Sequence, residues 1–196
     1  MSVEVRALAP GDWEALSALF GPRGACAGCW CMAWRVPQKQ WEAQRGEGNR
    51  RAFQGLVKRG RATGVLALSD GEAVAWCSVG PRADFAGLES RRSLATDWDE
   101  RTWSVTCFFV RRDWRQRGLG VRLLRRAVEL ARAHGATRVE GYPAPLPKGG
   151  GALPAAFAWT GLPHVFERCG FDPLAGPGKR PIYVRRLRPA KPSKKS

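Results

Sequence analysis

The sequence predicts one domain of mixed α/β (α+β) class, in which strands and helices alternate along 196 residues. Two adjoining segments carry this prediction. Residues 101–110 (RTWSVTCFFV) are rich in β-branched and aromatic residues, as buried strands are, and apolar residues recur at helical spacing from Leu119 to Ala131. A chain of this length can bury one substantial core, so we expect a single domain over residues 1–188.

The elements before this pair follow from simpler patterns. The N-terminal stretch MSVEVRALAPGDWEAL alternates as a strand does and continues as a helix, and it has neither a basic region nor a long apolar run. We therefore expect no signal peptide, no membrane span and a cytoplasmic protein. Residues 62–69 and 73–80 flank Asp70-Gly71, which is the turn chemistry of two adjacent antiparallel strands.

The elements after the pair are short. Gly135 closes the helix, and residues 137–142 (TRVEGY) predict a brief strand. Residues 143–151 (PAPLPKGGG) predict a loop that is either a flexible gate or an inert insertion. Residues 189–196 (PAKPSKKS) offer nothing to bury, so we expect a disordered basic tail.

The turn at residues 115–120 (RQRGLG) is the most informative part of the chain. Its glycines let main-chain N–H groups at a helix N-terminus approach an anion, and the aligned peptide dipoles there favour negative charge. The strings of a phosphate-binding loop, G-x-x-x-x-G-K-[ST], and of a dinucleotide fold, G-x-G-x-x-G, are both missing. The turn therefore predicts a pyrophosphate cradle of another kind, and an ordinary capped turn is the alternative.

The pattern [RQ]-x-x-G-x-[GA] in this turn resembles the coenzyme A loop of the GNAT acyltransferase superfamily. The resemblance is close over residues 101–187, where residues 159–171 (WTGLPHVFERCGF) look like the family's last helix and its closing Gly-Phe. It is loose over residues 1–60. Residues 29–35 (CWCMAWR) and 103–109 (WSVTCFF) resemble a bacterial branch of the superfamily that the sequence ties to no substrate.

The resemblance implies a fold and a donor. The fold is a central mixed, mostly antiparallel sheet of six to seven strands, with helices on both faces and a splay between the fourth and fifth strands. The donor is acetyl-CoA, used as a co-substrate without a metal, with its pantetheine arm in the splay. The residues that this assigns to coenzyme A are Phe108, Phe109, Val110, Arg115, Gln116, Arg117, Gly118, Leu119, Gly120, Val121 and Phe166.

The sequence departs from the family at the proton donor for the leaving thiolate. The family often has a tyrosine in the last helix, where this chain has Phe166, and an asparagine seven positions earlier, where it has Trp159. Either another residue donates the proton, or the thiolate leaves as such, which a pKa in the thiol range allows. Glu140 and Tyr142 share one face of their strand and are the candidate catalytic residues. The alternative is that Glu140 pairs with an arginine and Tyr142 only packs.

Residues 26–31 contain three cysteines as C-x-x-C-x-C. A closed zinc site needs four ligands, usually as two pairs, but no second pair follows and the only histidines are His134 and His164. The lack of an export signal disfavours a disulfide, and the lack of an adjacent basic partner disfavours a nucleophilic cysteine. We therefore expect small buried thiols that line a pocket, and no metal.

In the GNAT arrangement the loop between the first two helices forms a wall of the acceptor site. The residues expected to contact the acceptor are Trp30, Cys31, Trp34, Arg35, Thr106 and His164. For His164, capping or packing is the alternative to service as a base. The aromatic wall, to which Trp13, Trp98 and Trp159 are further candidates, predicts a compact and partly apolar amine.

The expected function is transfer of an acetyl group from acetyl-CoA to a primary amine of a small molecule or peptide, by direct attack on the thioester. One alternative is a CoA-binding protein of the same fold without catalysis, which the missing tyrosine favours. Another is acyl transfer to a protein or an aminoacyl-tRNA, which the net charge of +16 favours. The arginines are spread along the chain without a nucleic-acid-binding motif, so a nucleic-acid partner is not expected. Homodimers are common in the family, and the sequence leaves the oligomeric state, the acceptor and the acyl chain length open.

Overall fold

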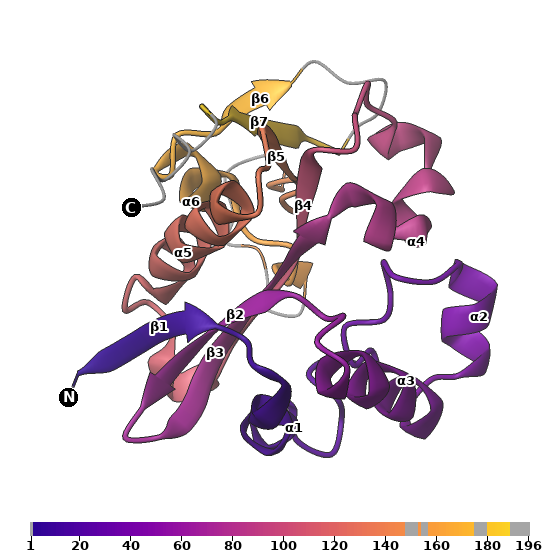
Figure 1. Ribbon diagram of the computed structural model, residues 1–196, viewed down its shortest axis with the longest axis vertical. Helices are drawn as coiled ribbons and strands as arrows, with labels where there is room; N and C mark the ends of the chain where they lie inside the picture. Colours follow the sequence, from indigo (N-terminus) through magenta and orange to yellow (C-terminus); the bar gives the residue numbers. More distant parts are fainter. Residues whose placement is uncertain (1, 148–152, 154–156, 175–179, 189–196) are drawn as a thin grey trace, which may run out of the picture.

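The computed structural model describes residues 2–147, 153, 157–174 and 180–188. These residues form a seven-stranded sheet in the order β1-β2-β3-β4-β5-β7-β6 (Figure 1). Strands β4 and β5 pair in parallel and the other described neighbours are antiparallel. This is the mixed, mostly antiparallel sheet that the sequence predicts. The expected tail at 189–196, and part of the expected loop at 143–151, lie outside the described residues.

The bounds of the elements follow in chain order. The N-terminal half contains β1 (Val3–Ala7), η1 (Pro10–Asp12), α1 (Trp13–Phe20), α2 (Gln38–Ala43), α3 (Glu47–Lys58), β2 (Gly64–Ser69), β3 (Glu72–Pro81), η2 (Arg82–Asp84), α4 (Ala86–Glu89) and η3 (Arg92–Leu94). The C-terminal half contains β4 (Thr102–Val110), η4 (Arg112–Trp114), α5 (Leu119–Ala133), β5 (Arg138–Gly141), α6 (Pro163–Glu167), β6 (Asp172–Leu174) and β7 (Ile182–Arg186). Within the described part of the chain, no helix has the length and apolar character needed to cross a bilayer.

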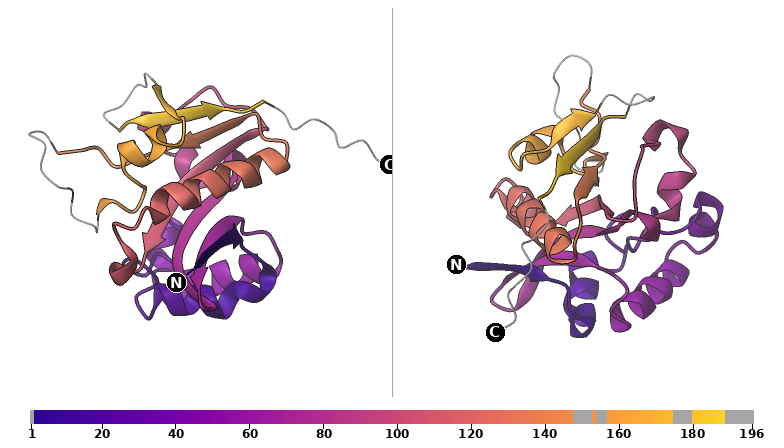
Figure 2. Two further views of the ribbon diagram at one scale, coloured as in Figure 1. Left: turned by 90° about the vertical axis from the view of Figure 1, so that its left-hand side faces the viewer. Right: turned by 45° about the horizontal axis from the view of Figure 1, so that its top comes forward.

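Strands β2 and β3 form the predicted hairpin and show the two faces of the sheet. Asp70 and Gly71 take positive φ angles of 51° and 82°, as a primed two-residue turn requires. Val65 of β2 packs with α5, whereas its neighbour Leu66 packs with α1 and α3. The face covered by α5 and α6 is called the α5 face below, and the opposite one the α1 face. Figure 2 shows helices on both faces.

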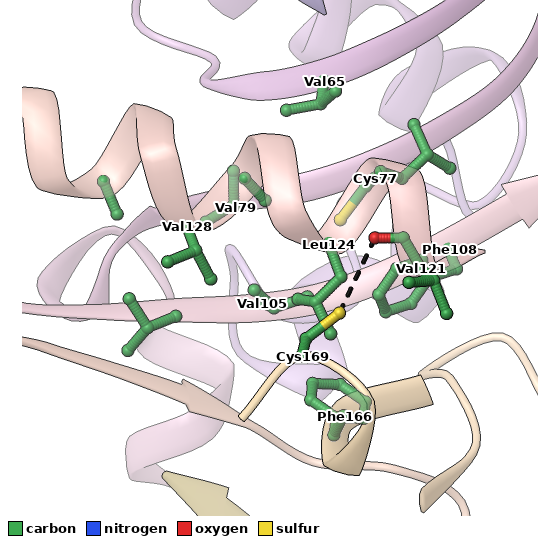
Figure 3. Close-up of a cluster of buried hydrophobic side chains, with 14 of the residues drawn as sticks. Val65, Cys77, Val79, Val105, Phe108, Val121, Leu124, Val128, Phe166 and Cys169 are labelled. Atoms are coloured by element: carbon green, nitrogen blue, oxygen red, sulfur yellow. Dashed lines mark hydrogen bonds between the residues drawn. The ribbon is translucent and has the colours of Figure 1, made fainter. Parts of the chain in front are cut away.

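Helix α5 packs its apolar stripe across the sheet. Leu124 and Val128 are buried against residues of β2, β3 and β4, which are drawn beside them in Figure 3. The segment after α6 closes over the first turn of α5, because the Cys169 thiol donates a hydrogen bond to the Val121 carbonyl at 3.6 Å (Figure 3). The start of α5 is therefore fixed from two directions, by the sheet and by the chain after α6.

The pairing of β4 with β5 ends halfway along β4. Residues 102–105 of β4 pair with residues 138–141 of β5, and the rest of β4, up to Val110, has no register with β5. The splay expected between the fourth and fifth strands therefore opens after Val105.

A β-bulge lies at the same point. Ser78 of β3 pairs with Cys107 and Val79 pairs with Val105, which leaves Thr106 as the extra residue of β4. The bulge reverses the alternation of side chains, since Val105 packs in the α5-face core and Cys107 packs in the α1-face core. It thus turns Cys107 and the residues after it to new faces where the sheet opens.

The last helix is shorter than the sequence predicts. Residues 159–171 resemble the family's last helix with its closing Gly-Phe, but α6 covers only Pro163–Glu167. Pro163 takes the first helical position, where proline is favoured, and it holds Leu162 extended (φ −112°, ψ 145°). The residues before it instead run beside β4, where the Phe108 N–H donates to the Trp159 carbonyl at 2.6 Å.

Candidate functional site

The bend before α5 has the geometry of an anion-binding turn. Gly118 is left-handed (φ 72°, ψ 8°) and a Cβ added there would meet nothing within 4 Å, so the bend is open. Gln116 is also left-handed (φ 61°). The first hydrogen bond of the helix runs from the Arg122 N–H to the Gly118 carbonyl at 3.3 Å, which leaves the N–H groups of residues 119–121 without an intrahelical partner.

Cationic side chains surround this bend. Residues 115–118 are exposed. The Arg115 Nε donates to the Val110 carbonyl at 3.1 Å, and the Arg117 guanidinium lies 4.9 Å from the centre of the Trp114 ring. The structure thus brings the loop residues assigned to coenzyme A together around open backbone amides and fixed positive charge, a combination that suits a pyrophosphate.

Three residues of β4 are expected to present backbone groups to the splay, and two of them do so. The Phe108 N–H donates to the Trp159 carbonyl, and the Val110 carbonyl accepts from Arg115, so both residues turn their backbone groups towards the splay. Backbone groups alternate between the two edges of a strand, so those of Phe109 face β3. The sequence assigned Phe109 to coenzyme A as well, and the geometry does not bring its backbone to this edge.

Phe166 lies beside this edge as a core residue. Its ring is fully buried and packs edge-on against Phe108 at 5.9 Å between ring centres. A Cβ added to Gly141 of β5 would lie 2.0 Å from the ring, so β5 and α6 meet closely here. Phe166 therefore closes one side of the splay by packing, and its side chain carries no proton to donate.

Glu140 and Tyr142 lie buried side by side, each with an exposure of 0%. The Tyr142 O–H donates to Glu140 Oε2 at 2.7 Å and lies 2.9 Å from the Ser104 Oγ. Glu140 pairs with Arg138 at 2.6 Å and with Arg82 at 3.4 Å. This is the alternative stated above, in which Glu140 pairs with arginine and Tyr142 packs.

Neither residue of this pair has the setting of a proton-transfer group. Burial, followed by the charge of Glu140, raises the pKa of Tyr142 well above its ordinary value, which makes the phenol a weaker donor to a thiolate. The Glu140 oxygens are held by two guanidinium groups and a phenol. The geometry therefore does not support the catalytic assignment of Glu140 and Tyr142.

The loop between α1 and α2 turns two of its candidate residues in different directions. Trp30 (φ 45°) packs against Trp13 and Phe20 with ring centres 5.8 Å apart in both pairs. It borders a surface hollow of about 500 Å³ between α1 and α3, to which Arg50 also contributes. Trp30 thus faces the outer side of the helices rather than the bulge of β4.

Cys31 points towards the sheet. The Trp76 indole N–H donates to its sulfur at 3.1 Å. A hydrogen bond with the Cys107 thiol lowers the pKa of Cys31, the Trp76 indole and the charge of Arg35 act in the same direction, and burial opposes them. Cys31 therefore contacts β4 at Cys107, directly after the bulge residue Thr106.

Trp34 lies in a group of aromatic and cationic side chains on the α1 face. Its ring stacks on Trp159 at 5.7 Å, and the guanidinium groups of Arg91 and Arg180 lie 4.5 and 5.6 Å from its centre. Arg180 also donates to the Thr160 Oγ1 at 2.7 Å. Trp34 and Trp159 together cover the splay on this face.

The remaining acceptor candidates divide between the two faces. Arg35 is 8% exposed, with its guanidinium 4.7 Å from the Phe85 ring and 5.9 Å from the Phe53 ring on the α1 face. Thr106 is buried at the bulge, where its hydroxyl donates to the Ser78 Oγ at 3.2 Å. His164 is exposed on α6, on the α5 face, and so it is not brought together with the other acceptor candidates.

Sequence reasoning missed several residues that shape this region. Arg82, Arg91 and Arg180 belong to no motif, and a sequence with arginines along its whole length does not single them out. Phe85 lies between two short helical segments after β3, η2 and α4, where the sequence has no apolar periodicity. The β-bulge that sets Thr106 apart needs the register of two strands, which no single segment encodes.

The six cysteines have free thiols, and Cys31, Cys77, Cys107 and Cys169 are buried. Among the residues that the structure describes, no three side chains of His, Cys, Asp or Glu are placed to hold one metal ion.

Known structures resemble this one over nearly the whole chain. A PaiA N-acetyltransferase from Thermoplasma acidophilum in complex with coenzyme A has 14% sequence identity and a TM-score of 0.56, covering 95% of this chain and 100% of that chain. A GNAT-superfamily phosphinothricin acetyltransferase from Sinorhizobium meliloti in complex with AcCoA has 15% identity and a TM-score of 0.55, covering 98% and 95%. An agmatine N-acetyltransferase, in the apo form of a mutant, has 18% identity and a TM-score of 0.59, covering 95% and 100%. At these identities the likeness shows the fold.

The family follows from the sequence itself. A search of curated protein sequences finds no match. The sequence model of the Acetyltransferase (GNAT) family matches residues 30–142, which is more than half of the chain and runs from the loop after α1 to the end of β5. The chain belongs to the GNAT family of acetyltransferases.

Proposed function

We propose that this chain transfers an acetyl group from acetyl-CoA to a primary amine of a small molecule or peptide, by direct attack of the amine on the thioester. The observation that carries the proposal is the open bend at Gly118, with free amides at the start of α5 and exposed arginines beside it. The bend follows β4 and η4 in the chain, and β4 is the strand that opens from β5 at the bulge.

The residues of the chain fit the parts of coenzyme A in order. The amides of residues 119–121, with Arg115 and Arg117, suit the pyrophosphate. The splay edge formed by Phe108 and Val110 suits the pantetheine arm, which requires the Trp159 carbonyl to leave the Phe108 N–H. The region beyond the bulge, on the α1 face, is then where the acceptor arrives.

The chemistry asked of these residues is modest. Acetyl-CoA supplies an acetyl thioester, which is already activated for attack by an amine. The Phe108 N–H, once released from Trp159, is a donor for the oxygen that gains charge as the amine attacks. The C–N bond forms as the C–S bond breaks, the proton of the amine passes to solvent, and the sulfur leaves as thiolate.

Substitution of Gly118 tests the proposal. Aspartate and asparagine both tolerate the left-handed conformation and nothing crowds the Cβ, so Gly118→Asp and Gly118→Asn keep the fold. We expect Gly118→Asp to abolish binding of CoA in calorimetry, because its carboxylate would face the pyrophosphate. Gly118→Asn, which has the same shape without the charge, keeps most of the affinity. Equal affinity for CoA in the wild type and in Gly118→Asp would remove the bend from the site.

A second candidate function is binding of CoA without catalysis. It is favoured by the packing of Phe166 and by the burial of Glu140 and Tyr142, which leave no described acid at the splay. Thiol release from acetyl-CoA with a panel of small amines, peptides and charged tRNA separates the two candidates. Tight binding of CoA without release of thiol on any acceptor favours the binding protein, and release only with a peptide or with charged tRNA assigns the larger acceptor.

A further inference from the structure

Arg35 is a buried guanidinium with one whole edge unpaired. The residue is 8% exposed, and its Nε and Nη2 atoms are buried with no hydrogen-bond partner among the described residues. These two nitrogens form the side-on edge of the guanidinium, whose parallel N–H groups match the two oxygens of a carboxylate. A buried charge is costly to leave unpaired, so this edge is the feature that needs an explanation.

A second buried arginine shows how the same fold neutralises such a group with carboxylates, although its Nε and Nη1 atoms also lack a hydrogen-bond partner among the described residues. Arg82 is 1% exposed, pairs with Glu140 at 3.4 Å and with Glu89 at 3.2 Å, and donates to the Leu94 carbonyl at 3.3 Å. Arg35 lies between the rings of Phe53 and Phe85, which hold its plane but accept no strong hydrogen bond. The charges of Cys31 and Asp84 act on Arg35 without a hydrogen bond to its Nε or Nη2 atom. The structure therefore holds Arg35 in place and leaves these two donors free for another group.

The position of Arg35 is next to the bulge of β4. Its charge acts on the Cys31 thiol, and Cys31 in turn contacts Cys107, which follows the bulge residue Thr106. Both side chains lie on the α1 face, where the splay opens. Arg35 lies over the Phe53 ring, and Phe53 belongs to the same buried cluster as Cys31 and Cys107, so a group bound by Arg35 would lie on the side of the sheet where acyl transfer is proposed.

The charge of the surrounding wall agrees with an anionic ligand. The guanidinium groups of Arg91 and Arg180 lie over the ring of Trp34, the neighbour of Arg35 in the sequence. Burial, followed by the charge of Arg91, lowers the pKa of Arg180, so these cations already disfavour each other. A polycationic acceptor would add to this repulsion, and an acceptor with a negative group would relieve it.

We infer that Arg35 binds a carboxylate of the acceptor, and that the substrates are small amines that also carry a carboxylate, such as amino acids. The inference rests on the proposed function, because it names the substrate class of that site. A role for Arg35 in stabilising the Cys31 thiolate would need only its positive charge. That role does not explain why the Nε and Nη2 donors are left without a partner. The carboxylate fixes the acceptor so that its amine faces the thioester.

The first experiment compares matched acceptors on the full-length protein. Thiol release from acetyl-CoA is measured with each α-amino acid beside its carboxamide, with β-alanine beside its amide, and with agmatine as a cationic acceptor. We expect kcat/KM for the carboxylates to exceed that for the carboxamides by about 30-fold or more, the effect of truncating one partner of a buried charge pair. Equal rates on both members of every pair that is turned over would overturn the inference.

Variants of Arg35 separate recognition from support of the fold. We expect Arg35→Gln to lower kcat/KM for the carboxylates by about 30-fold or more, mainly through KM, and to lower that for the carboxamides much less, because their oxygen carries no charge. Arg35→Lys keeps the charge near Cys31 but loses the side-on edge, so it does not restore the KM. Arg50→Gln is the matched control, since Arg50 also lies over aromatic rings, those of Trp13 and Trp30, but on the outer side. Wild-type kinetics in Arg35→Lys, or equal losses on both members of a pair in Arg35→Gln, would contradict the inference.

A binding measurement makes the test independent of turnover. Benzoate and acetate are titrated into the protein, without CoA, while tryptophan fluorescence is recorded. We expect saturable quenching in the wild type and in Arg50→Gln, and none in Arg35→Gln. Quenching that depends on Arg35 supports the carboxylate site, whether or not an amine is acetylated. If in addition no amine is acetylated, the proposed function is refuted and the carboxylate site stands. Lack of quenching in the wild type, or the same quenching in Arg35→Gln, refutes the carboxylate site even if CoA binds and amines are acetylated.

Discussion

Glu140 is a carboxylate without solvent whose charge is balanced inside the protein. It lies 2.6 Å from Arg138 and 3.4 Å from Arg82, and the Tyr142 O–H completes its contacts. A buried pair of this kind adds little to stability compared with apolar packing, but removal of one partner leaves the other charge uncompensated. The cost falls on Arg82, which is 1% exposed.

Glu140→Gln tests this balance. We expect the free energy of unfolding, measured in urea, to fall by about 3 kcal/mol, because Arg82 keeps its charge and loses its deepest partner. Tyr142→Phe is the milder control and is expected to cost about 2 kcal/mol, because it loses the hydrogen bonds of the phenol with Glu140 and Ser104 but removes no charge. A Glu140→Gln variant with wild-type stability and a large loss of kcat would instead return Glu140 to the catalytic group.

Asp12 gives a residue-scale prediction for pH. Its carboxylate accepts two hydrogen bonds from Arg6, at 2.6 and 2.8 Å, and one from the Ala9 N–H at 2.6 Å. The hydrogen bond with Arg6 is the main reason that the pKa of Asp12 lies below its ordinary value, and the Ala9 N–H adds to it against burial. The lowered pKa means that Asp12 stabilises the fold above about pH 4, and that this contribution is lost as the pH falls through the folded-state pKa.

We therefore expect Asp12→Asn to lower the free energy of unfolding by about 1 kcal/mol at pH 7, a modest value because the pair is partly screened by solvent. The difference between variant and wild type should shrink as the pH approaches 2. Urea titrations at both pH values measure it, and a difference that stays constant with pH would contradict the role given to the charge.

Residue-scale prediction from the sequence has a physical limit that Glu140 and Arg35 illustrate. The alternation of side chains along a strand correctly placed Glu140 and Tyr142 on one face, because this alternation can be read from the strand segment itself. It does not say whether that face is covered, and here Arg82 and Arg138 cover it. The burial of Arg35 between Phe53 and Phe85 depends on three segments that are distant in the sequence, so no local pattern could reveal it.

At the scale of elements, the contact between β5 and α6 has no spare room. A Cβ on Gly141 would lie 2.0 Å from the Phe166 ring, whereas a Cβ on Gly11 would meet nothing within 4 Å. The Phe166 ring also packs on Phe171, at 5.3 Å between ring centres, so it cannot move away freely. This contact closes the wall of the splay opposite β4.

We expect Gly141→Ala to destabilise the protein by about 1–3 kcal/mol, the usual cost of overpacking a core. For a chain of this size that corresponds to a fall in melting temperature of roughly 2–12 °C. Gly11→Ala, which adds the same methyl group in open space, is the control and should leave the melting temperature nearly unchanged. A loss of stability in Gly11→Ala equal to that in Gly141→Ala would show that the crowding at Phe166 is not the cause.

The elements that the sequence predicted well have local causes. The Asp70-Gly71 hairpin needs two left-handed residues in a row, and α5 needs an apolar stripe and a glycine bend. Helix α6 was predicted too long because residues 159–171 resemble the family's last helix, while the hydrogen bond of Trp159 to β4 is a tertiary contact. Tertiary contacts that compete with helix formation produce no repeating pattern of residues in the sequence, so they cannot be predicted from it.

At the scale of the whole molecule, the two halves of the sheet are joined by a short parallel pairing, and the chain carries a large excess of positive charge. Four register pairs connect β4 to β5, at residues 102–105 and 138–141. The net charge is +16. An anionic ligand at the bend before α5 would therefore stabilise the molecule in two ways, by ordering the open end of β4 and by relieving the repulsion among arginines.

We therefore expect CoA to raise the melting temperature by an amount that depends on salt. Free CoA at about 100 times its dissociation constant stabilises a protein by about 2.7 kcal/mol, which is roughly 5–10 °C for a chain of this size. We expect this shift in the wild type and in Gly118→Asn, and none in Gly118→Asp. Raising the salt from about 0.05 to 0.5 M at a fixed CoA concentration should reduce the shift, because the long-range attraction of the arginines is screened while the backbone amides of α5 are not. A shift that is insensitive to salt would assign the binding to those amides alone, and a shift that persists in Gly118→Asp would place CoA elsewhere on the protein.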